Sequence, residues 1–211
     1  MQELRPSIRS IVNISMEPIL INSLSNRILA DFMRCPYRFY WKNLRKKGGA
    51  QTEWREVVQY IVNQVIQDFY QSPVEKRSAF QILHLIENHW RIGIDLFGSK
   101  QEYYTVLAKV TDHLMQYLHR SEGLYPPLFL NEKINVYSEE LQTQLSTSIQ
   151  VSHWTNKTYN IKKYLVTDEQ SVIDLYKHFM IVFSYEAFQV LPEYIEVVSL
   201  IHGKTSTVFL Q

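Results

Sequence analysis

Residues 24–47 read LSNRILADFMRCPYRFYWKNLRKK, and this stretch holds the most informative pattern in the chain. Ser25 precedes the apolar positions and suits the N-cap of a helix, where its hydroxyl accepts a hydrogen bond from a first-turn amide. Apolar residues then recur at helical spacing and mark one apolar face: Ile28, Leu29, Phe32, Met33, Phe39 and Tyr40. Cys35-Pro36 interrupts them, because proline lacks an amide hydrogen and crowds the preceding turn, so we expect a kink or a break there.

A stripe of basic residues follows the same helical spacing on another side of this stretch: Arg34, Arg38, Lys42 and Arg45. Such a stripe is most simply a solvated helix face, and it also suits contacts with phosphate groups. Residues 1–50 carry nine Lys and Arg against three acids, whereas residues 51–211 carry thirteen against eighteen. The whole chain has a net charge of +1 and exerts no general pull on nucleic acid. Any contact with DNA is therefore expected through the N-terminal part.

The opening stretch resembles the first helix of the RecB/AddB/Cas4-type branch of the PD-(D/E)XK nuclease superfamily. Those proteins tend to begin with L-S-x-S-x-L-x-x-Y-x-x-C-P-x-x-F-x-x-x-x-L. The matching residues here are Leu24, Ser25, Leu29, Phe32, Cys35, Pro36, Phe39 and Leu44. The motif names a family but carries no catalytic group. The resemblance implies an α/β fold of the restriction-endonuclease type, in which an N-terminal helical lobe precedes a mixed sheet that carries the active site.

The rest of the chain has patterns that fit this order. Helical spacing of apolar residues predicts helices over 54–70, 79–90, 103–117 and 168–189. Alternation predicts strands over 128–136, 145–152, 158–166, 194–201 and 205–210. We therefore expect an N-terminal arm and helical lobe over residues 1–127, and a β-β-β-α-β-β core over residues 128–211. A chain of 211 residues most simply folds these two parts into one compact unit.

The resemblance also implies positions for the site. Such nucleases hold Mg²⁺ or Mn²⁺ with two carboxylates, a nearby lysine positions the attacking water, and a histidine of the helical lobe completes the shell. Asn63 falls at the histidine position, Gln150 and Asn160 fall at the two carboxylate positions, and Lys162 falls at the lysine position. Two amides in place of carboxylates remove about two formal charges, so affinity for a dication should collapse. The resemblance therefore implies a degenerate site without a bound metal.

Geometry adds a condition to this alignment. Asn160 and Lys162 share a strand face because they are two residues apart, and Gln150 joins that face if the hairpin register pairs it with Lys162. Gln150 and Asn160 are alternatively ordinary polar residues of a half-exposed hairpin. Glu132 is the one surviving acid near the implied site, and it could equally be an edge-strand charge.

Cofactors and compartment follow from what the sequence lacks. The single cysteine, Cys35, excludes an internal disulfide, and it excludes an iron–sulfur cluster unless ligands come from elsewhere. We expect no cofactor, or Mg²⁺ or Mn²⁺ if the protein is active. No run of about 18 apolar residues occurs, and residues 1–20 lack the apolar core of a signal peptide, so a cytoplasmic protein without a membrane segment is expected.

Three functions remain open at this stage. The first is a catalytically inactive nuclease homologue that binds DNA or a DNA-processing partner, such as the other subunits of a helicase/nuclease complex. The second is an active metal-dependent DNA nuclease with displaced carboxylates, for which Glu132, Asp168, Asp174 or an acid of the helical lobe would bind metal. The third is a protein–protein interaction module without nucleic acid.

Overall fold

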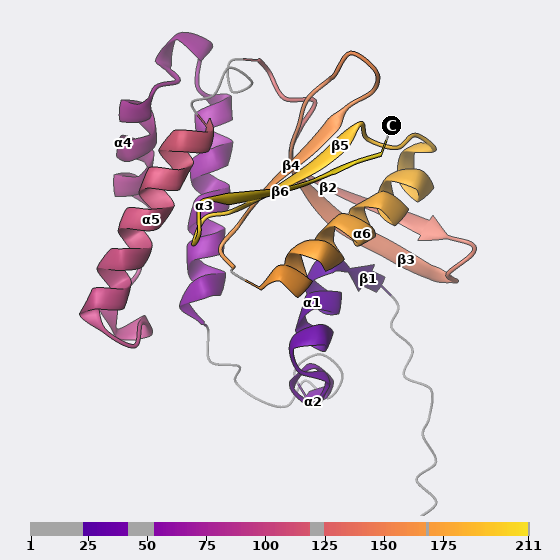
Figure 1. The fold of residues 1–211 in the computed structure, drawn as a ribbon, viewed down its shortest axis with the longest axis horizontal. Helices are drawn as coiled ribbons and strands as arrows, with labels where there is room; N and C mark the ends of the chain where they lie inside the picture. The colour runs from indigo at the N-terminus through magenta and orange to yellow at the C-terminus, as the bar shows by residue number, and fades with distance from the viewer. Residues whose placement is uncertain (1–22, 42–52, 119–124, 168, 211) are drawn as a thin grey trace, which may run out of the picture.

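The computed structural model describes residues 23–41, 53–118, 125–167 and 169–210. In these ranges the protein has an α/β fold, with N-terminal helices, a mixed six-stranded sheet and one C-terminal helix (Figure 1). The helices are α1 (Asn26–Arg34), α2 (Pro36–Phe39), α3 (Trp54–Gln71), α4 (Ala79–His89), α5 (Lys100–Leu118) and α6 (Gln170–Phe188). Short 3₁₀ helices cover Val74–Lys76 and Ile94–Leu96.

The six strands form one sheet in the order β1-β3-β4-β5-β6, and β2 pairs with β3 outside this path. Their bounds are β1 (Ser23–Ser25), β2 (Phe129–Ser138), β3 (Thr143–Ser152), β4 (Asn160–Leu165), β5 (Tyr194–Ser199) and β6 (Lys204–Phe209). The pairs β1–β3 and β4–β5 are parallel, and the other pairs are antiparallel. The predicted helices-first order, followed by β-β-β-α-β-β, is therefore confirmed.

Two apolar cores lie on the two faces of the sheet. In the first, α3, α4 and α5 cover one face, where Tyr164 and Val198 are fully buried. In the second, α6 covers the other face, where Ile161 and Val197 are fully buried. Figure 1 shows the three lobe helices on one side of the sheet and α6 on the other. Side chains of β4 and β5 thus alternate between the helical lobe and α6.

The local signals of the opening stretch act as expected. Ser25 is the N-cap of α1, and the Ile28 amide donates to its hydroxyl across 3.2 Å. The α1 helix ends at Arg34, Cys35 takes an extended backbone with φ −161° and ψ 100°, and α2 begins at Pro36. The predicted break is confirmed, because a residue before proline avoids the helical region.

The strand β1 was not predicted. It pairs in parallel with β3, from Ser23 opposite Gln144 to Ser25 opposite Ser146. A segment of the N-terminal arm therefore belongs to the sheet, and α1 follows it directly and packs beside α6 (Figure 1). Residues 1–22, which precede β1, lie outside the described residues.

The helical lobe is tied to the far end of the sheet through α5. His113 Nδ1 lies 2.7 Å from the main-chain oxygen of Leu200, and the Tyr117 hydroxyl donates to the oxygen of Gly203 across 2.7 Å. Gly203 has a positive φ of 64° in the turn between β5 and β6. None of the described helices has a stretch long and apolar enough to cross a membrane.

Candidate functional site

The strands β3 and β4 diverge almost at once after their turn. Only Val151 and Lys162 are paired between them, and β1 lies alongside β3 further on, at Gln144–Ser146. The divergence leaves main-chain groups of β4 without a neighbouring strand at Tyr164 and beyond. Such groups need other hydrogen-bond partners when buried.

Side-chain amides supply these partners. Gln59 of α3 donates through Nε2 to the Tyr164 oxygen (2.9 Å) and accepts through Oε1 from the Val166 amide (2.9 Å). Gln150 of β3 accepts through Oε1 from the Tyr164 amide across 2.6 Å. The two glutamines therefore complete the open edge of β4 as a neighbouring strand would.

Asn63 joins the two glutamines. Its Oδ1 accepts from Gln150 Nε2 (2.7 Å) and from Gln59 Nε2 (3.1 Å). Gln59 and Asn63 are one helical turn apart on α3, so both side chains reach the same edge of the sheet. The structure therefore brings together Asn63 and Gln150, two of the four positions implied by the resemblance. We refer to Gln59, Asn63 and Gln150 as the amide cluster.

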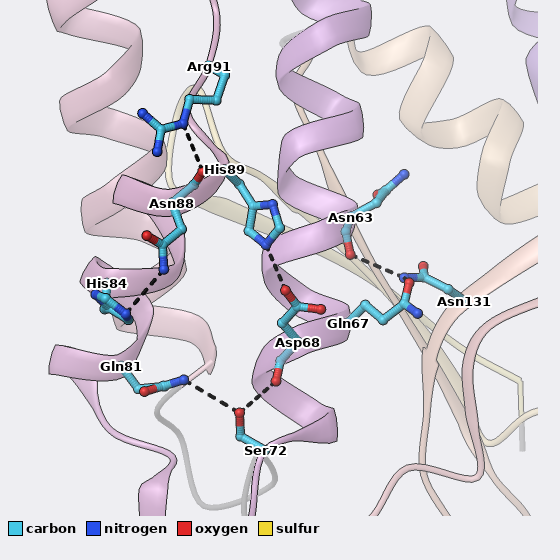
Figure 2. A network of polar contacts seen from close by, with 10 residues as sticks. All are labelled: Asn63, Gln67, Asp68, Ser72, Gln81, His84, Asn88, His89, Arg91 and Asn131. Carbon is cyan, nitrogen blue, oxygen red and sulfur yellow. Dashed lines mark hydrogen bonds and ion pairs between the residues drawn. The ribbon is translucent and has the colours of Figure 1, made fainter.

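A second contact fixes α3 against β2 next to the amide cluster. Asn131 has a positive φ of 51°, a conformation that asparagine tolerates better than most residues. Its Nδ2 donates to the Asn63 main-chain oxygen (3.2 Å) and to Gln67 Oε1 (3.3 Å), as Figure 2 shows. Figure 2 also shows His89 of α4 against Asp68 of α3, with Nε2 and Oδ2 2.7 Å apart. The helix α3 is thus held by side-chain contacts from β2 and from α4.

Asn160 and Lys162 have partners elsewhere. The register pairs Val151, not Gln150, with Lys162, so the expected register is wrong by one residue. Asn160 Oδ1 accepts from the His153 amide (2.9 Å), and its Nδ2 donates to the Tyr194 hydroxyl (2.7 Å). Lys162 Nζ lies 2.8 Å from Glu196 Oε2 on β5, in an almost buried ion pair. Gln150 therefore has different partners from these two side chains.

A cavity of about 460 Å³ opens beside the amide cluster, between α1, α3, the end of β4 and the start of α6. Asn63 and Gln59 line it from α3, Lys163 lines it from β4, and Tyr176 lines it from α6. Lys163 is on the opposite strand face from Lys162, as alternation requires. The cavity is therefore lined by Lys163 and not by Lys162, the lysine that the sequence analysis singled out.

Charges of both signs surround this cavity. Four basic residues line it, and three of them have partners. Arg27 lies 3.8 Å from Glu56, and Arg34 donates through Nε to both carboxylate oxygens of Glu169 (3.0 and 3.1 Å). The guanidinium of Arg55 lies over the Trp54 ring, 4.4 Å from its centre. Four acids also line it: Asp31, Glu53, Glu56 and Glu169. The rim is therefore nearly neutral overall.

Lys163 is different from the other basic residues. Burial lowers the pKa of its amine from 10.5 to about 8, and no described residue forms a hydrogen bond or an ion pair with it. Tyr176 is 2% exposed, and no described group bonds to its hydroxyl. Burial also raises the pKa of the Tyr176 phenol. Sequence reasoning missed both residues, although the Lys162-Lys163 pair on a strand placed one lysine on each face.

The basic stripe is described only in part. Arg34 is half-exposed and already paired with Glu169. The side chain of Arg38 lies outside the described part of the structure, as do residues Lys42 and Arg45. The prediction that these four residues contact DNA therefore stays a prediction.

The candidate acids do not gather. Glu132 is exposed on β2, and Asp174 Oδ1 lies 2.8 Å from Lys177 Nζ, which helps to lower the Asp174 pKa. Asp168 is outside the described residues. Within the described ranges, no group of three or more His, Cys, Asp and Glu side chains is arranged to hold a metal ion.

The chain was also compared with known proteins. A scan against protein-family models and a search of curated proteins both find no match to this sequence.

Proposed function

We propose that this chain is a catalytically inactive protein of the PD-(D/E)XK nuclease type, with a restriction-endonuclease-like core, that binds DNA or a DNA-processing partner. The order of its elements supports this proposal, and so does the meeting of Asn63 with Gln150 beside the divergence of β3 and β4. If the resemblance of the opening stretch extends to the later motifs of that family, both residues fall at its metal-ligand positions.

The proposal that the protein is inactive is supported by the oxygens of the amide cluster, which already accept hydrogen bonds from protein groups. Asn63 Oδ1 accepts two hydrogen bonds, and Gln150 Oε1 accepts one from a main-chain amide. A divalent cation would have to displace these donors and then bind neutral oxygens, which hold hard cations weakly. Asn160 Oδ1 is likewise occupied, and Glu196 pairs with Lys162. Gln59 and Gln150 instead bond to the main chain at the open edge of β4, a role that needs donors as well as acceptors.

Two measurements test the proposal. Purified protein with Mg²⁺ or Mn²⁺ should leave single-stranded and double-stranded DNA intact, because no metal-bound water is generated. Cleavage that is abolished in Glu132→Ala, while Gln150→Ala and Asn160→Ala stay active, would instead establish an active nuclease with displaced carboxylates.

DNA binding is tested separately. Binding to a fluorescent duplex should weaken as salt rises, and Arg34→Ala with Arg38→Ala should lower the slope by about 0.7–0.9 for each phosphate group that the variant no longer binds. Lys133→Ala on β2, with an exposed side chain in the same charge class, is the matched control. If the double variant kept the affinity for DNA and its salt dependence unchanged, the basic stripe would be a solvent-exposed helix face that does not contact DNA.

A protein–protein module is the second candidate. Exposed apolar side chains on α1 and α2 favour it, because Phe32, Met33 and Tyr37 are 48%, 51% and 73% exposed. If DNA does not bind, substitution of these three residues by serine should release a protein partner that the parent chain retains. A parent chain that retains no partner would remove this candidate.

A further inference from the structure

The cavity beside the amide cluster holds two polar groups that the fold does not satisfy. Lys163 carries a partly buried amine without a hydrogen-bond or ion-pair partner among the described residues, whereas the Tyr176 hydroxyl is deeply buried and bonded to no described group. Both line the same space of about 460 Å³. A buried hydroxyl without a partner is rare and costs free energy that a ligand can recover, and a partly buried amine beside it is a natural donor to the same ligand.

The donors define the kind of ligand. A lysine amine offers three N–H groups and no acceptor, and a tyrosine hydroxyl can donate one O–H. A group that satisfies both must therefore carry several acceptor oxygens, and negative charge would strengthen the contact. The lowered pKa of Lys163 fits the same view, because an anion beside the amine would restore its proton.

The rim favours phosphate over a simple carboxylate. Arg27 and Arg34 lie at the cavity with side chains that are 72% and 41% exposed, and guanidinium groups match the oxygens of a phosphate. Each is paired with an exposed acid, Glu56 or Glu169. Exposed pairs of this kind are weak, so an incoming dianion can compete for the arginines.

We propose that this cavity binds a phosphate group directly, without a metal ion, through Lys163 and Tyr176, with Arg27 and Arg34 at its entrance. The phosphate could be free, part of a nucleotide or the terminal phosphate of a DNA strand. The last of these rests on the proposed function. A terminal phosphomonoester suits the site better than an internal phosphodiester, because it carries more charge and can enter a recess end-on.

The experiment compares two single-stranded oligonucleotides of one sequence, with a 5′-phosphate or a 5′-hydroxyl, by fluorescence anisotropy in phosphate-free buffer. The phosphorylated strand should bind about tenfold more tightly, as expected for charge-assisted hydrogen bonds. Lys163→Met should abolish the preference, and Tyr176→Phe should reduce it about threefold. The controls are Lys133→Met on β2 and Tyr185→Phe on α6, two exposed side chains that should change nothing. Equal affinity for the two strands, or a preference that survives Lys163→Met, would overturn a site for terminal phosphates.

A second measurement separates the phosphate site from DNA binding. Lys163 should react readily with N-hydroxysuccinimide acetate near pH 8, and inorganic phosphate should protect it, as read by peptide mass spectrometry. Protection without any DNA binding would support the phosphate site and contradict the DNA-binding form of the proposed function. DNA binding that depends on Arg34 and Arg38, without protection by phosphate or preference for a 5′-phosphate, would reject the phosphate site alone.

Discussion

Gln59 lies beside Tyr164 as a residue of a neighbouring strand would, donating from its side-chain Nε2 to the Tyr164 main-chain oxygen across 2.9 Å. Its Oε1 accepts from the Val166 amide at the same time. A carboxylate could keep the second bond but not the first, because an ionised acid has no donor. The amide is thus required by the backbone of β4, whatever ligand the neighbouring cavity takes.

Gln59→Glu should therefore destabilise the protein by about 1–3 kcal/mol, the usual cost of a buried carbonyl group left without its donor. The measurement is the free energy of unfolding in urea. Gln67→Glu, on the same helix, is the matched control, since Gln67 Oε1 only accepts from Asn131 and a carboxylate can do the same. Equal destabilisation in the two variants would mean that the donor to Tyr164 does not matter.

Asn63 should tolerate an acid but not an apolar residue. Asn63→Asp retains an oxygen for the two donors that Asn63 Oδ1 accepts, so its free energy of unfolding should stay within about 1 kcal/mol of the parent. Asn63→Leu removes the acceptor of Gln150 Nε2 and one of the two acceptors of Gln59 Nε2, and it should cost about 2–4 kcal/mol. Unfolding in urea ranks the two variants. If the leucine variant were the more stable one, the hydrogen bonds to Asn63 Oδ1 would not stabilise the fold.

A metal site should be recoverable where Asn63 meets Gln150. Asn63→Asp combined with Gln150→Glu places two carboxylates where side-chain atoms now lie 2.7 Å apart, and their repulsion favours a bound dication. Mn²⁺ should raise the melting temperature of this variant and give a bound signal in electron paramagnetic resonance. Asn63→Asp with Asn160→Asp is the control, because Asn160 bonds to His153 and Tyr194 instead. If only the control variant responded to Mn²⁺, then Asn63 and Asn160, rather than Asn63 and Gln150, would be the two positions that converge on a metal site.

Lys163 should make stability depend on pH in a defined window. Its pKa is about 8 in the folded protein and near 10.5 when unfolded, so the unfolded chain binds more protons between these values. Stability then rises with pH from about 8 to 10.5, and below pH 8 the folded state bears the full cost of the buried charge. Lys163→Met should be more stable than the parent at pH 7 by about 2 kcal/mol, allowing for partial solvent screening.

This advantage should fade toward pH 10.5, as measured by urea unfolding in phosphate-free buffers. Lys133→Met is the control, because its exposed amine should give no such difference between pH 7 and 10.5. A constant offset between Lys163→Met and the parent across this range would show that the amine is not buried in its charged form.

Gly203→Ala should loosen the contact between α5 and the last hairpin. The positive φ of 64° disfavours a side chain, and an added Cβ would overlap the His113 ring. We expect the free energy of unfolding in urea to fall by about 1–3 kcal/mol. His113→Ala should be less harmful in the Gly203→Ala background than in the parent, because it removes the overlap. Gly98→Ala is the control, since only the end of the flexible Glu102 side chain lies near the added carbon, at 3.1 Å.

The sequence predicted those parts of the fold that depend on neighbouring residues. Apolar spacing predicted the helices and strands, the serine at position 25 predicted an N-cap, and Cys35-Pro36 predicted the break after α1. These features follow from local hydrogen bonding and backbone sterics. The strand β1 was missed because three residues show no period, and its partner lies far away in the chain.

The candidate site was predicted less completely. Asn63 and Gln150 do meet, but the hairpin register differs by one residue and Asn160 lies apart. Lys163 and Tyr176 were not singled out, since their shared cavity is lined by segments that lie far apart in the sequence, from α1, α3, β4 and α6. Divergence of two strands depends on packing across the whole sheet, and no local pattern encodes it.

The parallel pairing of β1 with β3 also sets an order of events during synthesis. A ribosome makes Ser23–Ser25 and α1 long before Thr143–Ser152 exist, so this segment has no strand to join while α3, α4 and α5 emerge. Its apolar side chains that pack against the second core, Leu24 and Leu29, remain without that core throughout the interval. The first described part of the chain to be translated is thus among the last that can reach its final position.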